Sequence, residues 1–334
     1  MKSYIPNTFQ INASCKRLLE LSSVDELLRE LPEIKAARDN DSLLIIGRGS
    51  NLLPTKDYDG LVVRSRIMGR DVLEDTADSV LLRCGSGETV DEVIAWSIAN
   101  GYYGMENLSL IPGEVGASAV QNIGAYGVEA KDVIETIEAV DIETGQMTTI
   151  RNAECQYAYR HSLFKTEWKN RFVIVAVAYR LAKTFTAKLE YGNIKSVLEE
   201  KGIANPTAQQ LRDAIIEIRN AKLPDPDVEG NAGSFFMNPI VPKAEFLRLQ
   251  ALYPNMPHYK VDDENEKIPA GWLIDQCGWK GRTVGNAGVH AKQALVLVNR
   301  GGAQGEEILS LCRAIREDVK EMFGVEINPE VNII

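Results

Sequence analysis

Hydrophobic and polar positions in the first hundred residues predict strands and helices in alternation. Ser23 and Glu26 have the spacing of a capping box, which predicts a helix over 24–31. Residues 43–46 form a continuous apolar run with the length of a buried strand, and residues 80–84 form another. This part of the chain is therefore expected to be a mixed α/β structure.

A second helix is expected to run to Asn100. Thr89 and Glu92 repeat the capping-box spacing, and Gly101 suits the left-handed position that follows a last helical turn. A turn-rich stretch follows over 111–127. Loops of this length without periodicity are usually functional.

The middle of the chain predicts a hairpin and then a helix. Residues 137–142 and 147–150 alternate in character around a short turn, and 172–181 reads as a further strand. Thr207 and Gln210 cap a helix with one apolar face. The proline-broken segment 222–226 then ends this helix, and we expect it to be a domain boundary.

Beyond this boundary the pattern predicts a separate small α/β unit. Helices are expected over about 242–252 and 304–323, with a strand over 294–299 between them. The tail 326–334 is hydrophobic for a chain end, so we expect it to be packed rather than frayed.

Composition narrows the class of protein. The 334 residues allow two or three domains, and 45% hydrophobic with 25% charged residues is ordinary for a globular chain. A net charge of −10 argues against a nucleic-acid binder, which needs clustered Lys and Arg. The N-terminus lacks a signal-peptide core, no apolar run could span a bilayer, and the five cysteines contain no C-x-x-C pair. We therefore expect a soluble cytoplasmic protein without a metal site.

The segment 230–239 (GNAGSFFMNP) places one hydroxyl, that of Ser234, among glycines and small residues before two phenylalanines. Such a serine can act as a nucleophile or as a proton donor. A nucleophile needs a positioned base, usually histidine, but the chain has only three histidines and the segment is not a G-x-S-x-G elbow. A proton donor has no such requirement. The segment alone indicates an ordered site loop, with a structural turn as the alternative.

The loop 47–51 (GRGSN) follows the first predicted strand. It is not a Rossmann loop, because Leu52 stands where that motif needs its third glycine. The bend offers backbone N–H groups, Ser50 and Asn51 to a pyrophosphate, although a plain tight turn explains it equally well.

The stretch 111–127 has glycines at 113, 116, 124 and 127 among small residues. These permit close backbone approach to a flat or phosphorylated ligand, and Gln121 and Asn122 suit the polar edge of a heteroaromatic ring. Cofactor binding is favoured here over a scaffold role.

Two single residues are candidates for binding a carboxylate or acting beside one. Arg160 lies among aromatic residues and could bind a carboxylate through two hydrogen bonds, although a surface cation–π contact is equally ordinary. Glu330 follows Pro329 in the apolar tail, where a solvated terminal glutamate is the simpler interpretation.

The order and joint presence of these segments carry a family resemblance. Over nearly its whole length the chain resembles the UDP-N-acetylenolpyruvoylglucosamine reductases, flavoenzymes that complete the muramic acid sugar of bacterial peptidoglycan. The segments that carry it are 47–51, Ile111-Pro112-Gly113, 121–127, Tyr159-Arg160, 230–236 and Pro329-Glu330.

The resemblance implies an α+β fold, with a two-unit FAD-binding fold of the vanillyl-alcohol-oxidase type and a C-terminal α/β substrate-binding domain. The implied divisions are 1–66 joined by 326–334, then 67–220, then 221–325 for the substrate-binding domain. Non-covalent FAD is implied to contact Gly47, Arg48, Gly49, Ser50, Asn51, Leu52, Pro112, Gly113, Gly116, Ser118, Gln121, Asn122, Gly124, Ala125, Tyr126, Gly127 and Arg219.

The implied activity is an NADPH-dependent reduction at a CH–CH bond. NADPH reduces the FAD, whose N5 then gives a hydride to C3 of the enolpyruvyl ether of UDP-N-acetylglucosamine, which yields UDP-N-acetylmuramate. Ser234 matches the family's proton donor to C2, and Arg160 and Glu330 match residues that stabilise the enol-like intermediate. Glu330 can do so by hydrogen bonding only when protonated, which burial promotes.

By resemblance, Tyr191 matches a tyrosine that closes over the substrate diphosphate in one subclass of the family. Further substrate contacts are implied for Lys222, Asn238 and Gln293. Met237 and His161 depart from the usual basic and acidic residues, which puts substrate and NADPH affinity in question. A monomer is expected, with the sugar nucleotide and NADPH as partners and neither nucleic acid nor membrane.

Two rival functions remain open. An oxygen-using oxidase of the same fold class often tethers its flavin through His or Cys in the phosphate-binding region, and 47–53 contains neither. A catalytically inactive nucleotide-sugar-binding protein predicts loss of Arg160, Ser234 and Glu330, all of which are present.

Overall fold

The computed structural model describes residues 3–334, which divide into two compact units. Of the described residues, unit 1 contains 3, 15–48 and 59–221, and unit 2 contains 4–14, 49–58 and 222–334. Each unit is therefore assembled from segments that are far apart in the sequence.

The central element of unit 1 is an antiparallel sheet of five strands in the order β11-β10-β12-β7-β6. The predicted hairpin is present, since Ile137 of one strand lies opposite Ile150 of the next. The strands are β6 (Arg70–Asp75), β7 (Ser79–Gly85), β10 (Ile134–Asp141), β11 (Met147–Arg151) and β12 (Phe172–Ala182).

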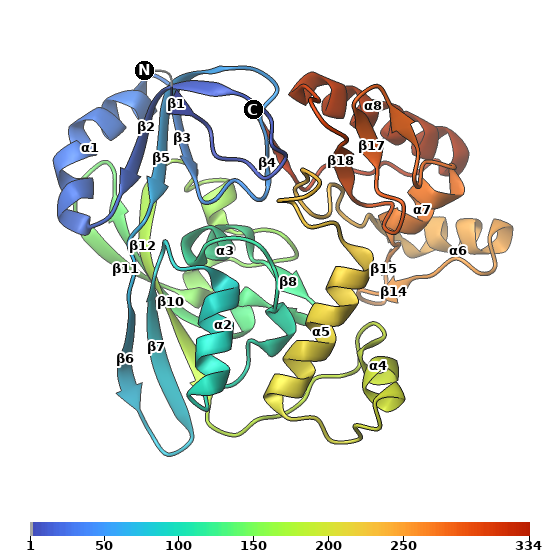
Figure 1. Cartoon of the computed structure of the whole chain (residues 1–334), viewed down its shortest axis with the longest axis horizontal. Helices are drawn as coiled ribbons and strands as arrows, with labels where there is room; N and C mark the ends of the chain where they lie inside the picture. Colours follow the sequence, from blue (N-terminus) through green and yellow to red (C-terminus); the bar gives the residue numbers. More distant parts are fainter. Residues whose placement is uncertain (1–2) are drawn as a thin grey trace. The chain divides into compact units, whose positions relative to one another are not determined.

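Helices α2 (Val90–Ala99) and α3 (Val115–Gln121) pack against this sheet through one hydrophobic core (Figure 1). Ile94 of α2 and Ala119 of α3 are fully buried with Val177 of the sheet. The glycine-rich stretch 111–127, which includes α3, is therefore packed against this sheet.

A second core in unit 1 lies between helix α1 (Val24–Asp39) and a sheet of order β1-β2-β5-β3. It includes Leu27 and Ile34 of the helix and Val173 and Val175 of β12. The strands are β1 (Ser3–Tyr4), β2 (Ser14–Leu21), β3 (Leu43–Ile46) and β5 (Tyr58–Ser65), and β3 runs parallel to β5.

Our prediction that the first helix ends at residue 31 is wrong. Helix α1 continues through Pro32 to Asp39, because Leu27 before the proline and Ile34 after it are both fully buried and extend one apolar face. The Ser23 hydroxyl accepts the Glu26 N–H at 3.1 Å, as the capping pattern predicts.

The other predicted caps have mixed outcomes. Thr207 and Gln210 form the full box, with Gln210 N–H bonded to the Thr207 hydroxyl at 3.2 Å and Thr207 N–H to the Gln210 amide oxygen at 2.9 Å. Thr89 makes no side-chain cap, since its backbone instead bridges Glu114. Gly101 has the expected positive φ of 77° after α2.

The remaining elements of unit 1 are a helix pair and several short strands and turns. The Thr207 box opens α5 (Ala208–Lys222), which packs on α4 (Ile194–Glu200) through Leu198 and Ile215. The others are strands β8 (Gly124–Ala125) and β9 (Val128–Glu129) and 3-10 turns at Glu106–Leu108, Ala130–Asp132, Asn152–Cys155 and Leu163–Lys165.

Unit 2 contains two three-stranded sheets, in the orders β13-β15-β14 and β16-β17-β18, and a parallel pair of β4 with β19. The pair of β4 (Leu52–Leu53) with β19 (Asn332–Ile333) ties down the hydrophobic tail, as predicted. The other elements are β13 (Ile240–Pro242), α6 (Lys243–Leu252), β14 (Tyr259–Lys260), β15 (Asn265–Lys267), α7 (Ala270–Gln276), β16 (Thr283–Val284), β17 (Ala287–Val289), β18 (Leu297–Asn299) and α8 (Gly305–Phe323).

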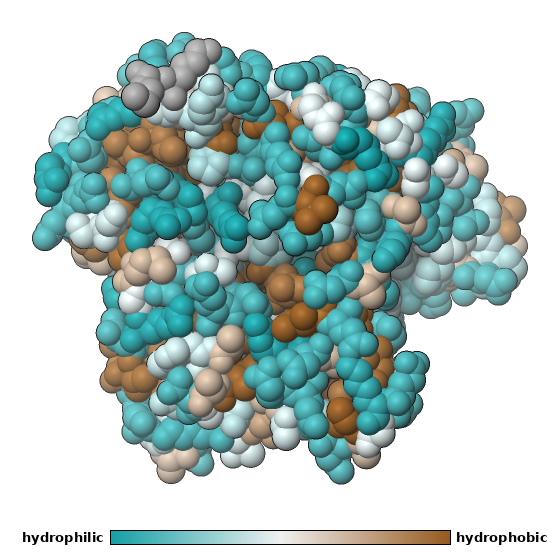
Figure 2. Space-filling view, viewed as in Figure 1, coloured by the Kyte–Doolittle hydropathy of each residue, from teal (hydrophilic) through white to brown (hydrophobic). Residues whose placement is uncertain are grey.

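The surface is polar over most of the face shown in Figure 2, where hydrophobic residues appear in small groups. None of the helices formed by residues 3–334 has the combined length and apolar character needed to cross a bilayer.

Replacing Gly49 with alanine is expected to destabilise unit 2. Gly49 has a φ of 78°, and a Cβ there would overlap the Pro6 carbonyl oxygen and lie 2.7 Å from Asn7 Cα. Strain of this kind costs on the order of 1–3 kcal/mol. Urea denaturation should show a larger loss than for Gly202→Ala, which has a similar φ of 70° but no atom within 4 Å of the added Cβ. Equal losses in the two variants would show that the overlap is relieved without cost.

Candidate active site

The Ser234 segment is an ordered loop fixed at both ends in unit 2. Gly230 allows close contact with the Phe9 carbonyl, which a Cβ at this position would overlap. The Phe235 N–H donates to the Leu295 carbonyl at 2.7 Å, and the rings of Phe235 and Phe236 are fully buried. The predicted ordering of this loop is present, and it leaves Ser234 itself half-buried.

Glu330 lies on the segment that pairs with this loop. Its N–H donates to the Phe235 carbonyl at 2.8 Å, and the Met237 N–H donates to the Asn328 carbonyl at 2.9 Å. Phe236 and Pro329 form an isolated antiparallel bridge between these two bonds. Ser234 and Glu330, far apart in sequence, thus lie on adjacent segments of one unit, and Glu330 is half-buried.

The predicted pyrophosphate loop is divided between the units. Residues 49–51 belong to unit 2, where the Asn51 amide donates to the Glu330 carbonyl at 3.2 Å and the Asn332 N–H donates to the Asn51 carbonyl at 3.1 Å. Leu52 is buried at the start of β4. Gly47 belongs to unit 1, where a Cβ would lie 2.9 Å from that of Ala117 in α3.

The stretch 111–127 is not the continuous loop that we expected. Residues Val115–Gln121 form helix α3, because Gly116 lets the helix approach Ser86 so closely that an added Cβ would lie 2.8 Å from the Ser86 Cβ. Asn122 ends the helix in the left-handed conformation, with a φ of 47°. The small residues of this stretch therefore permit close packing of the helix, in addition to any role in ligand binding.

Several predicted cofactor residues lie around this helix. Gly113 precedes it with a φ of 140°, and Pro112 is exposed. The Ser118 hydroxyl is buried and donates to the Val115 carbonyl at 2.6 Å, so it is used within the helix. Gly124 and Ala125 form strand β8 after it.

Arg160 is brought to the end of this stretch. One guanidinium nitrogen donates to the Gly124 carbonyl at 2.8 Å and another to the Asn122 carbonyl at 3.4 Å. Its guanidinium carbon also lies 5.4 Å from the centre of the Tyr159 ring, so the cation–π contact that we considered is present as well. These contacts orient the guanidinium beside residues 122–124.

A second group in unit 1 combines Tyr126, Arg219 and Tyr191. Arg219 lies beside the Tyr126 hydroxyl, whose pKa is raised by burial and lowered in part by the guanidinium. Burial lowers the pKa of Arg219. Tyr191 lies against Gly127, since a Cβ there would be 3.5 Å from the Tyr191 Cβ.

Asn107 contacts the candidate site, and our sequence analysis did not name it. It is buried, and its amide donates to the Tyr126 carbonyl at 2.9 Å and the Lys188 carbonyl at 3.0 Å. It thereby joins the 121–127 region to the segment that leads to Tyr191. Nothing in the sequence around a single asparagine indicated this role.

The predicted substrate contacts of unit 2 gather in part at the start of α7. Asn238 accepts the Ala270 N–H at 2.9 Å, and Gln293 accepts the Leu295 N–H at 3.3 Å. A Cβ on Gly271 would lie 3.1 Å from the Gln293 amide oxygen. Lys222 is exposed at the last position of α5.

Two buried polar atoms in unit 1 fit an FAD ligand. The Gln121 amide nitrogen and the Arg219 Nε are enclosed, and neither has a hydrogen-bond partner among residues 3–334. Buried donors of this kind are costly unless a ligand or water satisfies them. Both belong to the residues for which a flavin contact was predicted, so the donors present suit a polar heteroaromatic cofactor.

The pKa of the Cys277 thiol is raised to about 11, by burial first and then by the charge of Asp318. Below that pH the reactive thiolate is scarce, so alkylation of Cys277 in the folded protein should become about tenfold faster per pH unit between pH 8 and 10. Mass spectrometry after a short iodoacetamide pulse measures this slope, and protein unfolded in guanidinium is the control. A native rate that levels off near pH 9 would contradict the raised pKa.

Comparison with known proteins identifies the two parts of the chain. A family model described as "FAD binding domain" matches residues 17–151, and one described as "UDP-N-acetylenolpyruvoylglucosamine reductase, C-terminal domain" matches residues 225–334. Two bacterial proteins named UDP-N-acetylenolpyruvoylglucosamine reductase are similar throughout. The one from Bacteroides fragilis is 51% identical over 328 residues, which cover 98% of this chain and 97% of that protein. The one from Flavobacterium johnsoniae is 44% identical over 335 residues, which cover 100% and 98%.

A solved structure shows the same fold. The crystal structure of UDP-N-acetylenolpyruvylglucosamine reductase from Thermus caldophilus covers 100% of this chain and 98% of that chain, with a TM-score of 0.70 at 21% identity. The FAD-binding model and the reductase relatives define an FAD-dependent oxidoreductase. With half of its residues identical over nearly the full length, the chain belongs to the UDP-N-acetylenolpyruvoylglucosamine reductase family. The predicted family, the FAD cofactor and the fold class of an FAD-binding part with a C-terminal domain are confirmed.

Proposed function

We propose that this chain reduces the enolpyruvyl ether of UDP-N-acetylglucosamine enolpyruvate to UDP-N-acetylmuramate, with NADPH as the hydride donor, in peptidoglycan precursor synthesis. The observation that carries the proposal is the sequence identity of 44–51%, over nearly the whole chain, to proteins named as this reductase. FAD, when bound, supplies the hydride that the substrate carbon C3 receives.

Ser234 is proposed to deliver the proton to C2 of the substrate. A serine hydroxyl is a poor acid in water, so its environment must favour the donation through fixed dipoles and partial exclusion of water. The half-buried position of Ser234, between Gly230 and the buried Phe235, supports this role.

Arg160 and Glu330 are proposed to stabilise the enol-like intermediate through the substrate carboxylate. The Arg160 guanidinium is oriented by the carbonyls of residues 122 and 124, which limits the rotamer freedom lost on binding. Glu330 is held by its backbone beside the Ser234 loop. The role of Glu330 requires the carboxyl to be protonated when it donates a hydrogen bond.

The cofactor and substrate contacts implied by the resemblance remain part of the proposal. Gln121, Arg219 and the other flavin contacts would hold FAD, and residues 47–51 would bind its pyrophosphate without a covalent tether. Tyr191, Lys222, Asn238 and Gln293 would bind the sugar nucleotide. We also propose the division into 1–66 with 326–334, 67–220 and 221–325, which the pairing of β19 with β4 supports in part, and a monomer as the working state.

A spectroscopic titration tests the proposed function. The purified protein should show a flavin absorbance that NADPH bleaches and that UDP-N-acetylglucosamine enolpyruvate restores in the absence of oxygen. Recovery only with oxygen would favour the oxidase, and a flavin that stays bound to denatured protein would indicate a covalent tether. A protein that binds the sugar nucleotide without ever reoxidising the flavin would be the inactive binder.

A further inference from the structure

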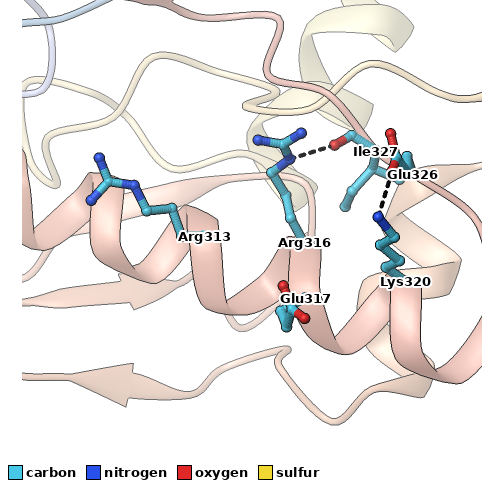
Figure 3. A pocket seen from close by; sticks show the side chains of 6 residues that line it. All are labelled: Arg313, Arg316, Glu317, Lys320, Glu326 and Ile327. Atoms are coloured by element: carbon cyan, nitrogen blue, oxygen red, sulfur yellow. Dashed lines mark hydrogen bonds and ion pairs between the residues drawn. The ribbon is translucent and has the colours of Figure 1, made fainter.

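The short segment between α8 and Glu330 is held to that helix by two cations (Figure 3). Arg316 Nε donates to the Ile327 carbonyl at 2.8 Å, and an Arg316 Nη donates to the Asn328 side-chain oxygen at 3.2 Å. The Lys320 ammonium bonds the Glu326 carboxylate at 2.7 Å. Three consecutive residues of the segment are therefore bound by side chains of one helix.

The same segment pairs with the Ser234 loop on its other side. The Asn328 carbonyl accepts the Met237 N–H, Pro329 bridges Phe236, and the Glu330 N–H donates to the Phe235 carbonyl. Arg316 thus acts on residues 327 and 328, and the register that these residues set continues directly through Glu330.

The side of the segment that faces α8 borders a polar groove. A groove of about 230 Å³ lies between α8 and the segment, and its lining is mostly charged: Arg313, Arg316, Glu317, Lys320, Glu326 and Ile327. Only Ile327 is apolar, and its side chain is fully buried. Burial of Ile327 therefore anchors the segment on one side, and the hydrogen bonds of Arg316 hold the Ile327 carbonyl and the Asn328 side chain on the side of the groove.

We propose that Arg316 is a positioning residue for the reaction, because it fixes the register of residues 327–330 against 235–237 and so the mutual placement of Glu330 and Ser234. This inference rests on the roles of Ser234 and Glu330 in the proposed function. Arginine suits the task, since its planar fork addresses a backbone carbonyl and a side-chain oxygen at once. A lysine has no such fork and can keep only one of the two bonds in this geometry.

Stopped-flow measurement of the two half-reactions tests the proposal. In Arg316→Gln, reduction of the flavin by NADPH should stay within about twofold of the wild-type rate. Reoxidation by the enolpyruvyl nucleotide should slow at least about tenfold, because a small misplacement of reacting groups is costly. The reoxidation rate of Arg316→Lys should lie between those of the wild type and Arg316→Gln. The lysine variant provides the measurement if the glutamine variant does not fold.

The matched control is Arg313→Gln. Arg313 lies one turn earlier on the same helix and borders the same groove, but its ion pair is with Glu306 of α8, at 2.8 Å. The substitution removes the same charge without touching the segment, so both half-reactions should keep their wild-type rates.

Two results would overturn the inference. One is a folded Arg316→Gln protein that reoxidises at the wild-type rate, which would leave Arg316 a structural role only. The other is an equal slowing of both half-reactions, which would indicate a general loss of structure. Ser234→Ala is measured in parallel, because wild-type reoxidation in that variant would refute the proposed proton donor, whatever the outcome for Arg316.

Discussion

Replacing Ser234 with alanine is expected to leave reduction of the flavin by NADPH close to the wild-type rate and to slow its reoxidation by the enolpyruvyl nucleotide by about 10²–10⁴-fold. The size is that of a lost general acid, since the proton to C2 must then come from solvent. The side chain is half-buried in an ordered loop, so the substitution removes one oxygen and leaves the backbone contacts of Phe235 in place.

Anaerobic stopped-flow absorbance separates the two half-reactions and measures this effect directly. Ser310→Ala is the control, because Ser310 is an exposed serine on α8 in the same unit. Reoxidation near the wild-type rate in the Ser234→Ala protein would mean that another group protonates C2.

The elements that the sequence predicts best are those with a local signal of their own. The apolar run at 43–46 is strand β3 over the predicted residues, and the capping box at Thr207 and Gln210 forms in full. Helix α1 runs past its expected end because burial of Ile34, a tertiary effect, outweighs the local preference of Pro32 to stop a helix. Local rules miss such cases, because the compensating contact lies elsewhere in the fold.

Helix α3, in the candidate site, is another element that local sequence rules do not predict. Residues 116–119 of this helix are glycine, alanine, serine and alanine. Such small residues show little hydrophobic periodicity, so the sequence pattern suggests a loop. The helix is held by close approach to Ser86, which no neighbouring residue in the sequence reveals. The sequence names candidate residues such as Arg160, but the contacts of Arg160 with the carbonyls of 122 and 124 and those of Asn107 depend on the folded chain.

A buried ion pair lies at the entrance to this helix. Glu114 immediately precedes α3, is almost fully buried, and accepts hydrogen bonds from Arg64, including one from Nε at 3.1 Å. Arg66 lies 3.6 Å away and is more exposed. The Glu114 carboxylate is also close to Gly47, where an added Cβ would lie 3.1 Å from it. The pair thus supports both α3 and the unit 1 part of the predicted pyrophosphate loop.

Substituting Arg64 with methionine is therefore expected to destabilise the protein by roughly 3–5 kcal/mol, because it leaves a buried carboxylate without its main partner. The double variant Arg64→Met with Glu114→Gln should recover more than half of this loss, since the charges that lose a partner, Glu20 and Arg66, are both exposed to solvent. Urea denaturation of the apoprotein measures the free energy of unfolding, and flavin released on dilution reports whether α3 still supports the cofactor. Arg151→Gln is the control, because its ion pair with Glu154 is exposed and should contribute far less. If Arg64→Met alone is as stable as the double variant, Arg66 has taken over the Glu114 carboxylate, and the charge at the start of α3 is neutralised by either arginine.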